Sequence, residues 1–295
     1  MMQTASRQSD LEASFQHCRR LTRQTAKNFY YSFLTLPADV RRDMYALYAY
    51  MRVCDDLGDD MTVPLEERRA NLAEWRNSVT DAFDSGSSPH PVLPALADVV
   101  RRRNVPTEPL LDVIDGVEMD LSPVAFETFA QLENYCYHVA GAVGLCCIHV
   151  WGFQGEAARE HAIQCGLAFQ LTNILRDLAE DADNGRVYLP REDLDRFEYS
   201  PADLAARVND HRFQQLMTFE VERARNFYKQ SQPLADSLDP VGRPVLLAMR
   251  RIYGGLLTEI ERRDYDVFTR RVSLPKWKKL TIAGSSLWNV RSQRQ

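Results

Sequence analysis

The sequence predicts an all-α protein, and three features of its composition and pattern indicate this fold class. Apolar residues recur at spacings of three and four over long windows, which is the period of amphipathic helices. The alternating pattern of β-branched residues that is typical of strands is hard to find, and glycine is scarce, with 13 in 295 residues. A chain of this length can bury a core of many helices, and without internal repeats we expect one domain over residues 1–295.

The predicted helices follow one another along the chain, each defined by an apolar repeat at helical spacing. They cover residues 11–26, 38–58, 65–83, 92–103, 108–120, 126–151, 156–181, 201–234 and 241–265. The clearest start signal is Ser200, a hydroxyl cap that precedes Pro201 at the first helical position and the carboxylate of Asp203 at the third. Residues 84–94 are the most linker-like stretch, and residues 183–185 are typical of a turn. Helical patterns lie on both sides of each, so neither marks a domain boundary.

Composition and charge exclude several classes of protein. With 45% hydrophobic and 26% charged residues the chain is globular, and no apolar run reaches the roughly 18 residues that a membrane-spanning helix needs. The net charge of −5 argues against a nucleic-acid partner. The 6 cysteines form no CxxC pair and the 6 histidines show no ligand spacing, which argues against zinc. The N-terminus lacks the apolar core of a secretory signal, so we expect a cytoplasmic protein.

The C-terminal segment is strongly basic. Residues 267–295 contain no acidic residue, and their basic residues are Arg270, Arg271, Lys276, Lys278, Lys279, Arg291 and Arg294. Together with Trp277, Leu280 and Trp288, the tail of about residues 273–295 is suited to rest on an anionic membrane surface, which would place the protein at the periphery of the inner membrane. A solvated and partly disordered terminus is the alternative.

A first group of carboxylates lies at the end of the second predicted helix. Asp55 and Asp59 are four residues apart, so a helix places both carboxylates on one face, and Asp56 and Asp60 repeat this arrangement one step around. Such like charges destabilise a helix by roughly a few tenths of a kcal/mol. Gly58 destabilises it by about 1 kcal/mol more, relative to alanine. We therefore expect a cation to compensate.

A second group follows an apolar run in the segment 165–181. Gln170, Asn173, Asp177 and Asp181 form a single helical stripe that continues into what should be core. If this stripe faces the first group across a cavity, four or more oxygen ligands surround a site of the kind that Mg²⁺ and a phosphate-bearing substrate prefer. Each group also carries an arginine, Arg52 or Arg176, which either forms an ordinary salt bridge or binds a diphosphate beside the metal.

These segments resemble the squalene/phytoene synthase family, whose members join two prenyl diphosphates head to head. The first family motif, DxxxD, resembles residues 55–59, and the second, NxxxDxxxD, resembles residues 173–181. Further blocks that resemble the family are residues 27–33, 48–52, 135–144, 185–190 and 267–272. The resemblance extends from about residue 15 to residue 279. Gly58 departs from it, because relatives usually carry a larger residue there.

The resemblance implies an isoprenoid-synthase fold, a single helical bundle around a central cavity whose mouth binds Mg²⁺, or Mn²⁺, with the diphosphates of the substrates. It implies metal ligands at Asp55, Asp59, Asn173, Asp177 and Asp181. It implies diphosphate-binding side chains at Arg52, Arg176, Arg270, Lys27 and Tyr253. It adds Gln170, Tyr48 and Tyr135 to the catalytic residues. Ionisation of an allylic diphosphate needs strong cations at the leaving group and a dry cavity.

Aromatic and small residues are expected to line this cavity. The aromatic candidates are Phe29, Phe33, Tyr48, Tyr135, Tyr137, Phe169 and Tyr253, whose rings exclude water and can stabilise a carbocation. The small candidates are Gly141, Ala142, Gly144, Gly166 and Ala168. The small residues either let two helices approach closely or leave room for long chains, and the sequence does not separate these interpretations.

The resemblance is greatest to bacterial presqualene diphosphate synthases of the hopanoid pathway, which implies condensation of two farnesyl diphosphates. The bulk of Phe33 favours C15 over C20 chains. The alternatives are a phytoene or dehydrosqualene synthase, or a squalene synthase that also uses NADPH. The sequence has no glycine-rich dinucleotide motif, which is weak evidence against NADPH. A non-catalytic relative that keeps the fold is the alternative from a different class.

Overall fold

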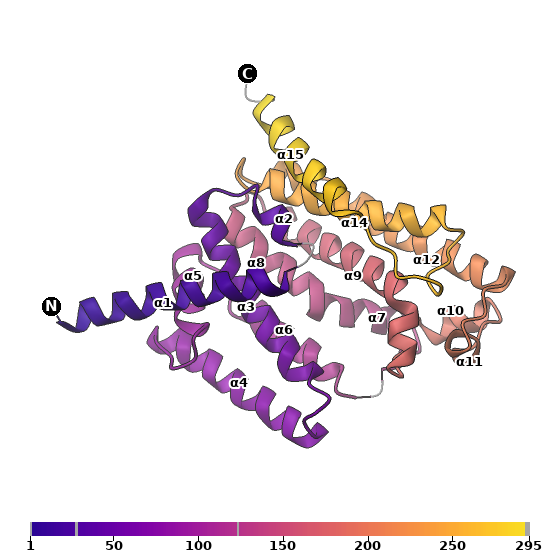
Figure 1. The fold of residues 1–295 in the computed structure, drawn as a ribbon, viewed down its shortest axis with the longest axis horizontal. Helices are drawn as coiled ribbons and strands as arrows, with labels where there is room; N and C mark the ends of the chain where they lie inside the picture. Colours follow the sequence, from indigo (N-terminus) through magenta and orange to yellow (C-terminus); the bar gives the residue numbers. More distant parts are fainter. Residues whose placement is uncertain (1, 27–28, 123, 293–295) are drawn as a thin grey trace.

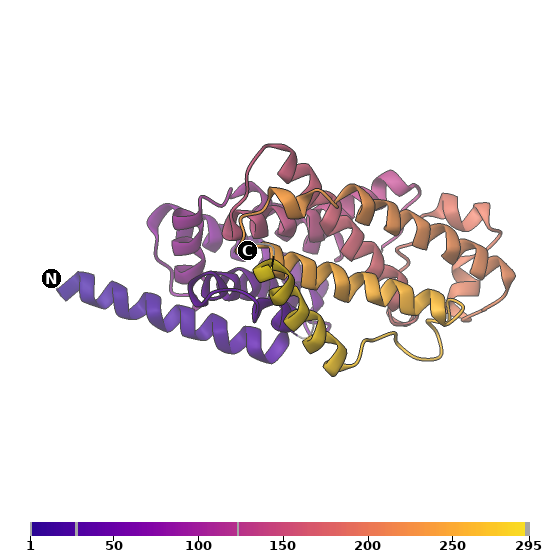
Figure 2. The same ribbon diagram turned by 90° about the horizontal axis from the view of Figure 1, so that it is seen from above.

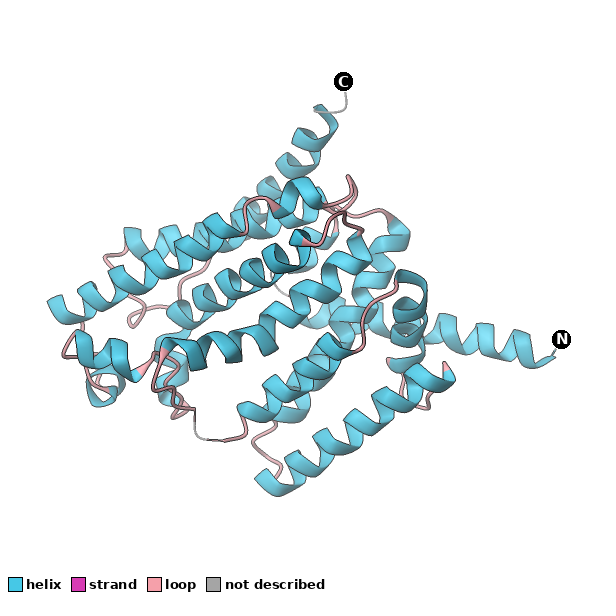
Figure 3. Cartoon of the chain, turned by 180° about the vertical axis from the view of Figure 1, so that it is seen from behind, coloured by secondary structure: helices cyan, strands magenta, loops and turns pink. Residues whose placement is uncertain are grey.

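The computed structural model describes residues 2–26, 29–122 and 124–292, and it is built from helices (Figure 1). In chain order they are α1 (Met2–Thr25), α2 (Phe29–Phe33), α3 (Ala38–Asp59), α4 (Leu65–Ser85), α5 (Leu93–Arg103), α6 (Glu108–Met119), α7 (Phe129–Cys136), the π-helix η1 (Tyr137–Gly141), α8 (Ala142–Trp151), α9 (Ala157–Asp183), α10 (Arg191–Arg196), α11 (Pro201–Ala205), α12 (His211–Gln230), α13 (Leu234–Ser237), α14 (Arg243–Arg262) and α15 (Lys276–Ser292). The described residues contain no strand, as Figure 3 shows, so the predicted all-α class is confirmed.

Two groups of helices pack around the long helix α9. The N-terminal group is centred on α3, which contacts α1, α4, α5, α6 and α8. In the other group, α9 contacts α7, α12 and α14 as well as α8 and η1. Tyr137 and Phe169 pack against the buried cores of both groups. Helix α1 projects from one end of the molecule and α15 crosses over α14 (Figure 1).

Two predicted helices are divided in the structure. The segment 126–151 begins as helix only at Phe129, after the Thr128 cap accepts a hydrogen bond from the backbone of Gln131, and it contains the π-helix η1. The segment 201–234 was predicted as one helix, and this prediction is wrong. Its expected start is present, because Ser200 and Asp203 form a capping box, but α11 ends after Ala205.

The break before α12 has a local cause. Arg207 adopts a left-handed conformation with φ 55°, which ends the helical path. Asp210 then caps a new helix by accepting hydrogen bonds from the backbone N–H groups of Arg212 and Phe213. The short helices α2, α10 and α13 (Leu234–Ser237) and the C-terminal helix α15 are further elements that were not predicted. Within the described part of the chain, no helix is both long enough and apolar enough to cross a membrane.

The glycines of α8 and α9 allow close contact between backbones. A Cβ atom at Gly144 would lie 2.7 Å from the carbonyl oxygen of Ala162, and one at Gly166 would collide with the carbonyl group of Ala140. Both glycines also line the cavity described below. At these two positions, the small residues therefore both let the helices approach closely and leave room in the cavity.

Candidate active site

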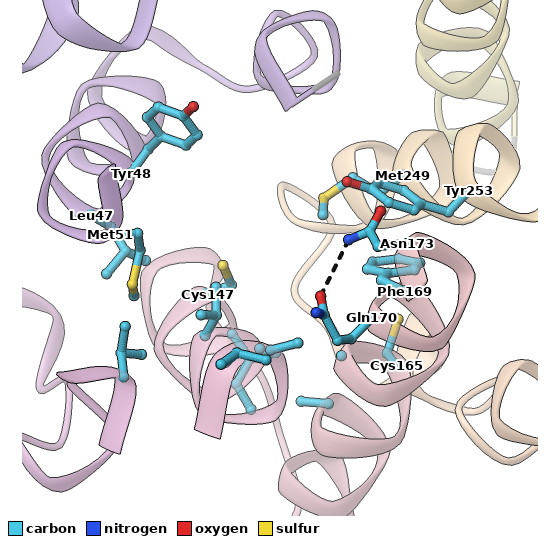
Figure 4. A pocket seen from close by; sticks show the side chains of 18 of the residues that line it. Leu47, Tyr48, Met51, Cys147, Cys165, Phe169, Gln170, Asn173, Met249 and Tyr253 are labelled. Carbon is cyan, nitrogen blue, oxygen red and sulfur yellow. Dashed lines mark hydrogen bonds between the residues drawn. The ribbon is translucent and has the colours of Figure 1, made fainter. Parts of the chain in front are cut away.

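A cavity of about 350 Å³ lies between α3, α8, α9 and α14. Figure 4 shows side chains of α3 facing side chains of α9 and α14 across this space. On α9, the lining residues run from Ala162 to Asn173, which corresponds to about 16 Å of helix. Along α9 this stretch runs from the apolar Ala162 to the polar side chains of Gln170 and Asn173, which mark the polar end of the cavity. The predicted central cavity is therefore present. Of the predicted carboxylates, Asp55 is in its lining, whereas Asp59, Asp177 and Asp181 are not.

On α3, the carboxylates of the first group point in different directions. Asp55 lines the cavity, Asp56 accepts a hydrogen bond from Arg52, and Asp59 forms an ion pair with Arg186 at 3.4 Å. Asp55 is exposed to the cavity space, although much protein lies around its carboxylate. Burial raises the pKa of Asp55 to about 7, the charge of Asp59 adds to this effect and Arg52 opposes it. A cation near Asp55 would relieve this cost.

Gly58 is helical within α3, and the reason for its small size is a contact with a neighbouring helix. A Cβ atom at Gly58 would collide with the side chain of Val117 on α6. The glycine therefore lets α3 and α6 pack closely beside the carboxylates. Although Gly58 departs from the family pattern, α3 stays helical here and carries both Asp55 and Asp59.

Asp120, which follows α6, is a residue of the site that the sequence analysis missed. Its carboxylate accepts hydrogen bonds from the hydroxyl groups of Tyr135 at 2.8 Å and Tyr188 at 2.9 Å. Burial raises the pKa of Asp120, although both phenol groups oppose this shift. The charge of Asp120 acts on both Asp55 and Asp181. Asp120 is therefore between the two predicted groups of carboxylates, and no spacing in the sequence relates it to either.

On α9, arginines hold the second group of carboxylates. The Nε atoms of Arg176 and Arg271 each lie 2.9 Å from Oδ1 of Asp177, and Arg271 also pairs with Glu180 at 3.2 Å. Burial raises the pKa of Asp177, but the two arginines outweigh burial and the pKa lies below its usual range. For Asp181, burial raises the pKa to about 7 and the charge of Asp177 adds to it.

Gln170 and Asn173 present amide groups to the same end of the cavity. Nδ2 of Asn173 donates a hydrogen bond to Oε1 of Gln170 at 3.3 Å, drawn as a dashed line in Figure 4. The Oδ1 atom of Asn173 is buried, and none of the described residues donates a hydrogen bond to it. Because a buried carbonyl oxygen without a partner is costly, this atom is suited to receive a cation or a donor of a ligand.

The two groups of carboxylates belong to one electrostatic site. Arg186 pairs with Asp59 and its charge also acts on Asp181, while Asp120 acts on Asp55 and Asp181. In the described ranges, no cluster of three or more His, Cys, Asp or Glu side chains is arranged to hold a metal ion. The carboxylates and the Asn173 oxygen are nevertheless the hard ligands that Mg²⁺ prefers, so the residues fit the ion.

Five predicted aromatic residues line the cavity: Phe33, Tyr48, Tyr135, Phe169 and Tyr253. Tyr253 stacks on Phe169, with ring centroids 4.6 Å apart, and Phe33 meets the edge of Tyr48. Tyr137 instead donates a hydrogen bond to Asp112 and is not part of the cavity wall that the described residues form.

The predicted cations are distributed unevenly. Arg52 lines the cavity, and Arg176 is held against Asp177. Arg270 is exposed, and its neighbour Arg271 makes the contacts with the second group of carboxylates. Lys279 of α15, which the sequence analysis did not select, is close enough to Arg176 for their charges to interact. Lys27 and the side chain of Phe29 lie outside the residues that the structure describes.

The described residues define the class of the protein as an all-α bundle around an apolar cavity, with carboxylate and amide side chains in the cavity wall. The comparison of sequences identifies the family. Residues 22–278 match the family model described as squalene/phytoene synthase, and the chain belongs to this family of prenyltransferases.

Similar proteins cover almost the whole chain. It is 38% identical to a phytoene synthase of Arthrospira platensis, over 95% of this chain and 93% of the relative, and 38% identical to a 15-cis-phytoene synthase of Synechocystis, over 92% and 84%. Among solved structures, a dehydrosqualene synthase with a bound ligand is 28% identical, with a TM-score of 0.88 over 96% of this chain and 99% of that one. The squalene synthase HpnC of Alicyclobacillus acidocaldarius is also 28% identical, with a TM-score of 0.81 over 87% and 96%. The isoprenoid-synthase fold is thereby confirmed.

Proposed function

We propose that this prenyltransferase condenses two molecules of geranylgeranyl diphosphate head to head to give phytoene. The observation that carries the proposal is an apolar cavity whose lining includes Asp55 of α3 and Asn173 of α9, each followed along its helix by further carboxylates. The identity of 38% to two phytoene synthases supports the C20 substrate. This substrate replaces the farnesyl diphosphate that the sequence analysis favoured.

The reaction loses two diphosphates and two protons. In the first half, the C–O bond of one allylic diphosphate breaks and its electron pair leaves with the diphosphate. The double bond of the second molecule attacks the resulting cation, and loss of a proton gives a cyclopropylcarbinyl diphosphate. In the second half, the remaining diphosphate leaves, the carbon skeleton rearranges, and loss of another proton gives phytoene. No reductant is needed, so NADPH is not part of this proposal.

The polar end of the cavity is assigned to the diphosphates. Mg²⁺, or Mn²⁺, would be held by Asp55, Asp59, Asn173, Asp177 and Asp181. When bound there, the ion would supply positive charge for the leaving diphosphate. Arg52, Arg176 and Tyr253 are assigned to bind the diphosphate oxygens. Arg271 joins them, because a diphosphate can replace Asp177 and Glu180 as the partner of its guanidinium group.

The apolar part of the cavity is assigned to the prenyl chains. Phe33, Tyr48 and the stacked pair of Phe169 and Tyr253 supply aromatic faces beside the polar end. Such faces stabilise a nearby cation by about 0.5–2 kcal/mol each and keep water away from it. The buried phenol of Tyr135 holds Asp120, whose charge adds to that of the acidic groups.

The second candidate is condensation of two farnesyl diphosphates to presqualene diphosphate. Two observations favour it: the 28% identity to squalene and dehydrosqualene synthases, and the position of Phe33 in the cavity wall, where a large ring shortens the space for a chain. A squalene synthase reaction would continue from presqualene diphosphate with NADPH as the hydride donor.

The products distinguish these reactions. Purified protein is incubated with Mg²⁺ and either geranylgeranyl or farnesyl diphosphate, with and without NADPH, and the lipids are identified by mass spectrometry. We expect phytoene from the C20 substrate, in equal yield with and without NADPH. Presqualene diphosphate, dehydrosqualene or squalene from the C15 substrate, with no product from the C20 substrate, would contradict the proposal. Absence of turnover on both substrates would indicate a non-catalytic relative.

A further inference from the structure

A second cavity, of about 320 Å³, lies at the surface between α1, α2 and α3. It shares no lining residue with the apolar cavity of the candidate active site. Pockets that bind small molecules begin at roughly 300 Å³, so its size suits a small ligand. Its basic lining residues are Arg19, Arg41 and Arg42, and its acidic one is Glu12. This basic pocket is therefore positively charged, although the chain carries a net charge of −5.

The helices that carry the three arginines are fixed to each other. Phe15 and Cys18 of α1 are buried in the core, and the hydroxyl group of Thr22 donates a hydrogen bond to the carbonyl oxygen of Tyr45 on α3 at 3.2 Å. Figure 2 shows α1 along the edge of the molecule, with its C-terminal half beside other helices. The basic pocket is therefore held open by packed helices and does not need a ligand to form it.

The acidic residues in the first two turns of α3 are paired with another helix. Asp43 forms ion pairs with Arg102 and Arg103 of α5, each at 2.7 Å. Arg103 also pairs with Asp39 at 3.5 Å. Arg41 lies between these two carboxylates along the chain, but both are engaged by α5. They do not neutralise the charge of the basic pocket.

The arginines of the basic pocket have few anionic partners. Arg42 forms one long ion pair, with Glu12 at 3.8 Å, and its guanidinium group lies 4.2 Å from the ring centre of Phe15. Among the described residues, no carboxylate forms an ion pair with Arg19 or Arg41. Like charges that are held in one small pocket repel each other, and a bound anion would relieve this repulsion.

Tyr45 adds a phenol group to the basic pocket and separates it from the apolar cavity. Burial raises the pKa of Tyr45, and the nearby charges of Arg41 and Arg19 oppose this shift. The two arginines therefore lie close to the same phenol group. On its other side, the ring of Tyr45 meets the edge of Phe33, which lines the apolar cavity, with ring centroids 6.3 Å apart. Guanidinium groups beside a phenol are donors that suit phosphate oxygens.

We propose that the basic pocket binds a soluble compound with several phosphate charges, of which inorganic diphosphate is the simplest form. Arg19 and Arg41 bind the phosphate oxygens, and Arg42 exchanges its long ion pair with Glu12 for a phosphate oxygen. A phosphodiester, such as a lipid headgroup, carries one charge and offers less to three guanidinium groups. The proposal does not depend on the prenyl substrate, because it uses none of the side chains of the apolar cavity.

Isothermal titration calorimetry of the full chain tests this site. Inorganic diphosphate is titrated into the protein in EDTA at constant ionic strength, because without a divalent ion the carboxylates of α3 and α9 repel a diphosphate. We expect one diphosphate to bind per chain. Glycerophosphoglycerol, a soluble phosphodiester headgroup, should bind at least about tenfold more weakly. The double variant Arg19→Gln/Arg41→Gln should also lose about tenfold or more in affinity for diphosphate.

Matched variants serve as controls. Arg20→Gln/Arg23→Gln removes two exposed charges of the same helix that do not line the basic pocket. Arg271→Gln removes an arginine of the candidate active site. Both variants should bind diphosphate in EDTA as the wild type does. Circular dichroism should show that all variants remain folded.

The proposal is overturned if the wild type binds no diphosphate in EDTA. It is also overturned if both double variants lose affinity equally, because net charge and not the pocket would then determine binding. Loss of binding in Arg271→Gln with wild-type affinity in Arg19→Gln/Arg41→Gln would place the anion in the candidate active site instead. Equal affinity for glycerophosphoglycerol and diphosphate would contradict the preference for several charges and indicate a phosphodiester headgroup as the ligand.

Discussion

At the scale of single residues, the site consists of carboxylates with different electrostatic surroundings. Asp55 and Asp181 are in positions that disfavour their charge, and their pKa values rise to about 7 through burial first and neighbouring carboxylates second. Asp177 is held by two arginines that lower its pKa against the effect of burial. Residues with the same proposed role therefore contribute differently to the stability of the metal-free protein.

Substitution of these carboxylates should separate the two effects. Asp55→Asn should leave the free energy of unfolding unchanged or raise it, because it removes a charge that neighbouring carboxylates repel. Asp177→Asn should lower it by about 1–3 kcal/mol, because Arg176 and Arg271 lose their charged partner. Urea denaturation in EDTA at pH 7.5 measures both. Equal destabilisation by the two variants would contradict this electrostatic account.

The sequence revealed the residues of the site that lie close together along one helix. The spacing of Asp55 and Asp59, and the stripe from Gln170 to Asp181, follow from helical geometry alone. The residues that were missed act across long separations. Arg271 is 94 positions from Asp177, and Arg186 is 127 positions from Asp59. Only tertiary packing creates such contacts, so periodicity carries no signal for them.

At the scale of helices, the sequence predicted long amphipathic elements well and interrupted ones poorly. The helix predicted over residues 38–58 is observed as Ala38–Asp59, and that over 156–181 as Ala157–Asp183. In the segment 201–234, the apolar repeat continues on both sides of a break that Arg207 and the Asp210 cap create. The apolar repeat favours one continuous helix, whereas the side chain of Asp210 favours a new helix start. Here the hydrogen bonds of the cap determine the structure.

Close packing of α9 against η1 requires a glycine at position 166. A Cβ atom at this position would collide with the backbone of Ala140 and Gly141 in η1, which cannot move away without separating the two helices. Gly166→Ala should therefore destabilise the protein by about 1–3 kcal/mol. The control is Gly254→Ala in α14, where no atom lies within 4 Å of the added methyl group. This variant should gain about 0.5–1 kcal/mol from the better helix propensity of alanine.

Thermal unfolding of the two glycine variants gives the comparison directly. A lower melting temperature for Gly166→Ala and an equal or higher one for Gly254→Ala would support the packing. Equal behaviour of the two variants would show that η1 and α9 are not in close contact in solution.

At the scale of the whole molecule, buried charges away from the cavity also connect the helices. Arg223 of α12 donates hydrogen bonds to Glu220 at 2.9 Å and to Asp193 of α10 at 2.7 Å. Two carboxylates thus share one guanidinium group. Burial raises the pKa of Glu220 to about 8, Arg223 opposes this shift, and Asp193 adds to it. At neutral pH the folded protein therefore tends to keep a proton on Glu220.

This proton makes stability depend on pH. Because the pKa of Glu220 is higher in the folded than in the unfolded chain, the folded state binds more protons between about pH 4.5 and pH 8. The contribution of Glu220 to the free energy of unfolding is fully present below this range and is lost as the pH rises through it. Glu220→Gln should weaken this dependence, whereas Glu222→Gln, an exposed change on the same helix, should preserve it. Urea titrations at several pH values measure the slope, and an unchanged slope in Glu220→Gln would contradict the assignment.

The central claim is that the acidic groups of α3 and α9 serve one diphosphate site through a divalent ion. The most direct test is the initial rate of diphosphate release from geranylgeranyl diphosphate, measured for the wild type and for Asp55→Asn over a range of Mg²⁺ concentrations and in EDTA. We predict that release by the wild type requires Mg²⁺ and that kcat/KM of the variant falls by about a hundredfold or more at every Mg²⁺ concentration. Undiminished release in EDTA, or a wild-type rate in Asp55→Asn, would contradict the claim.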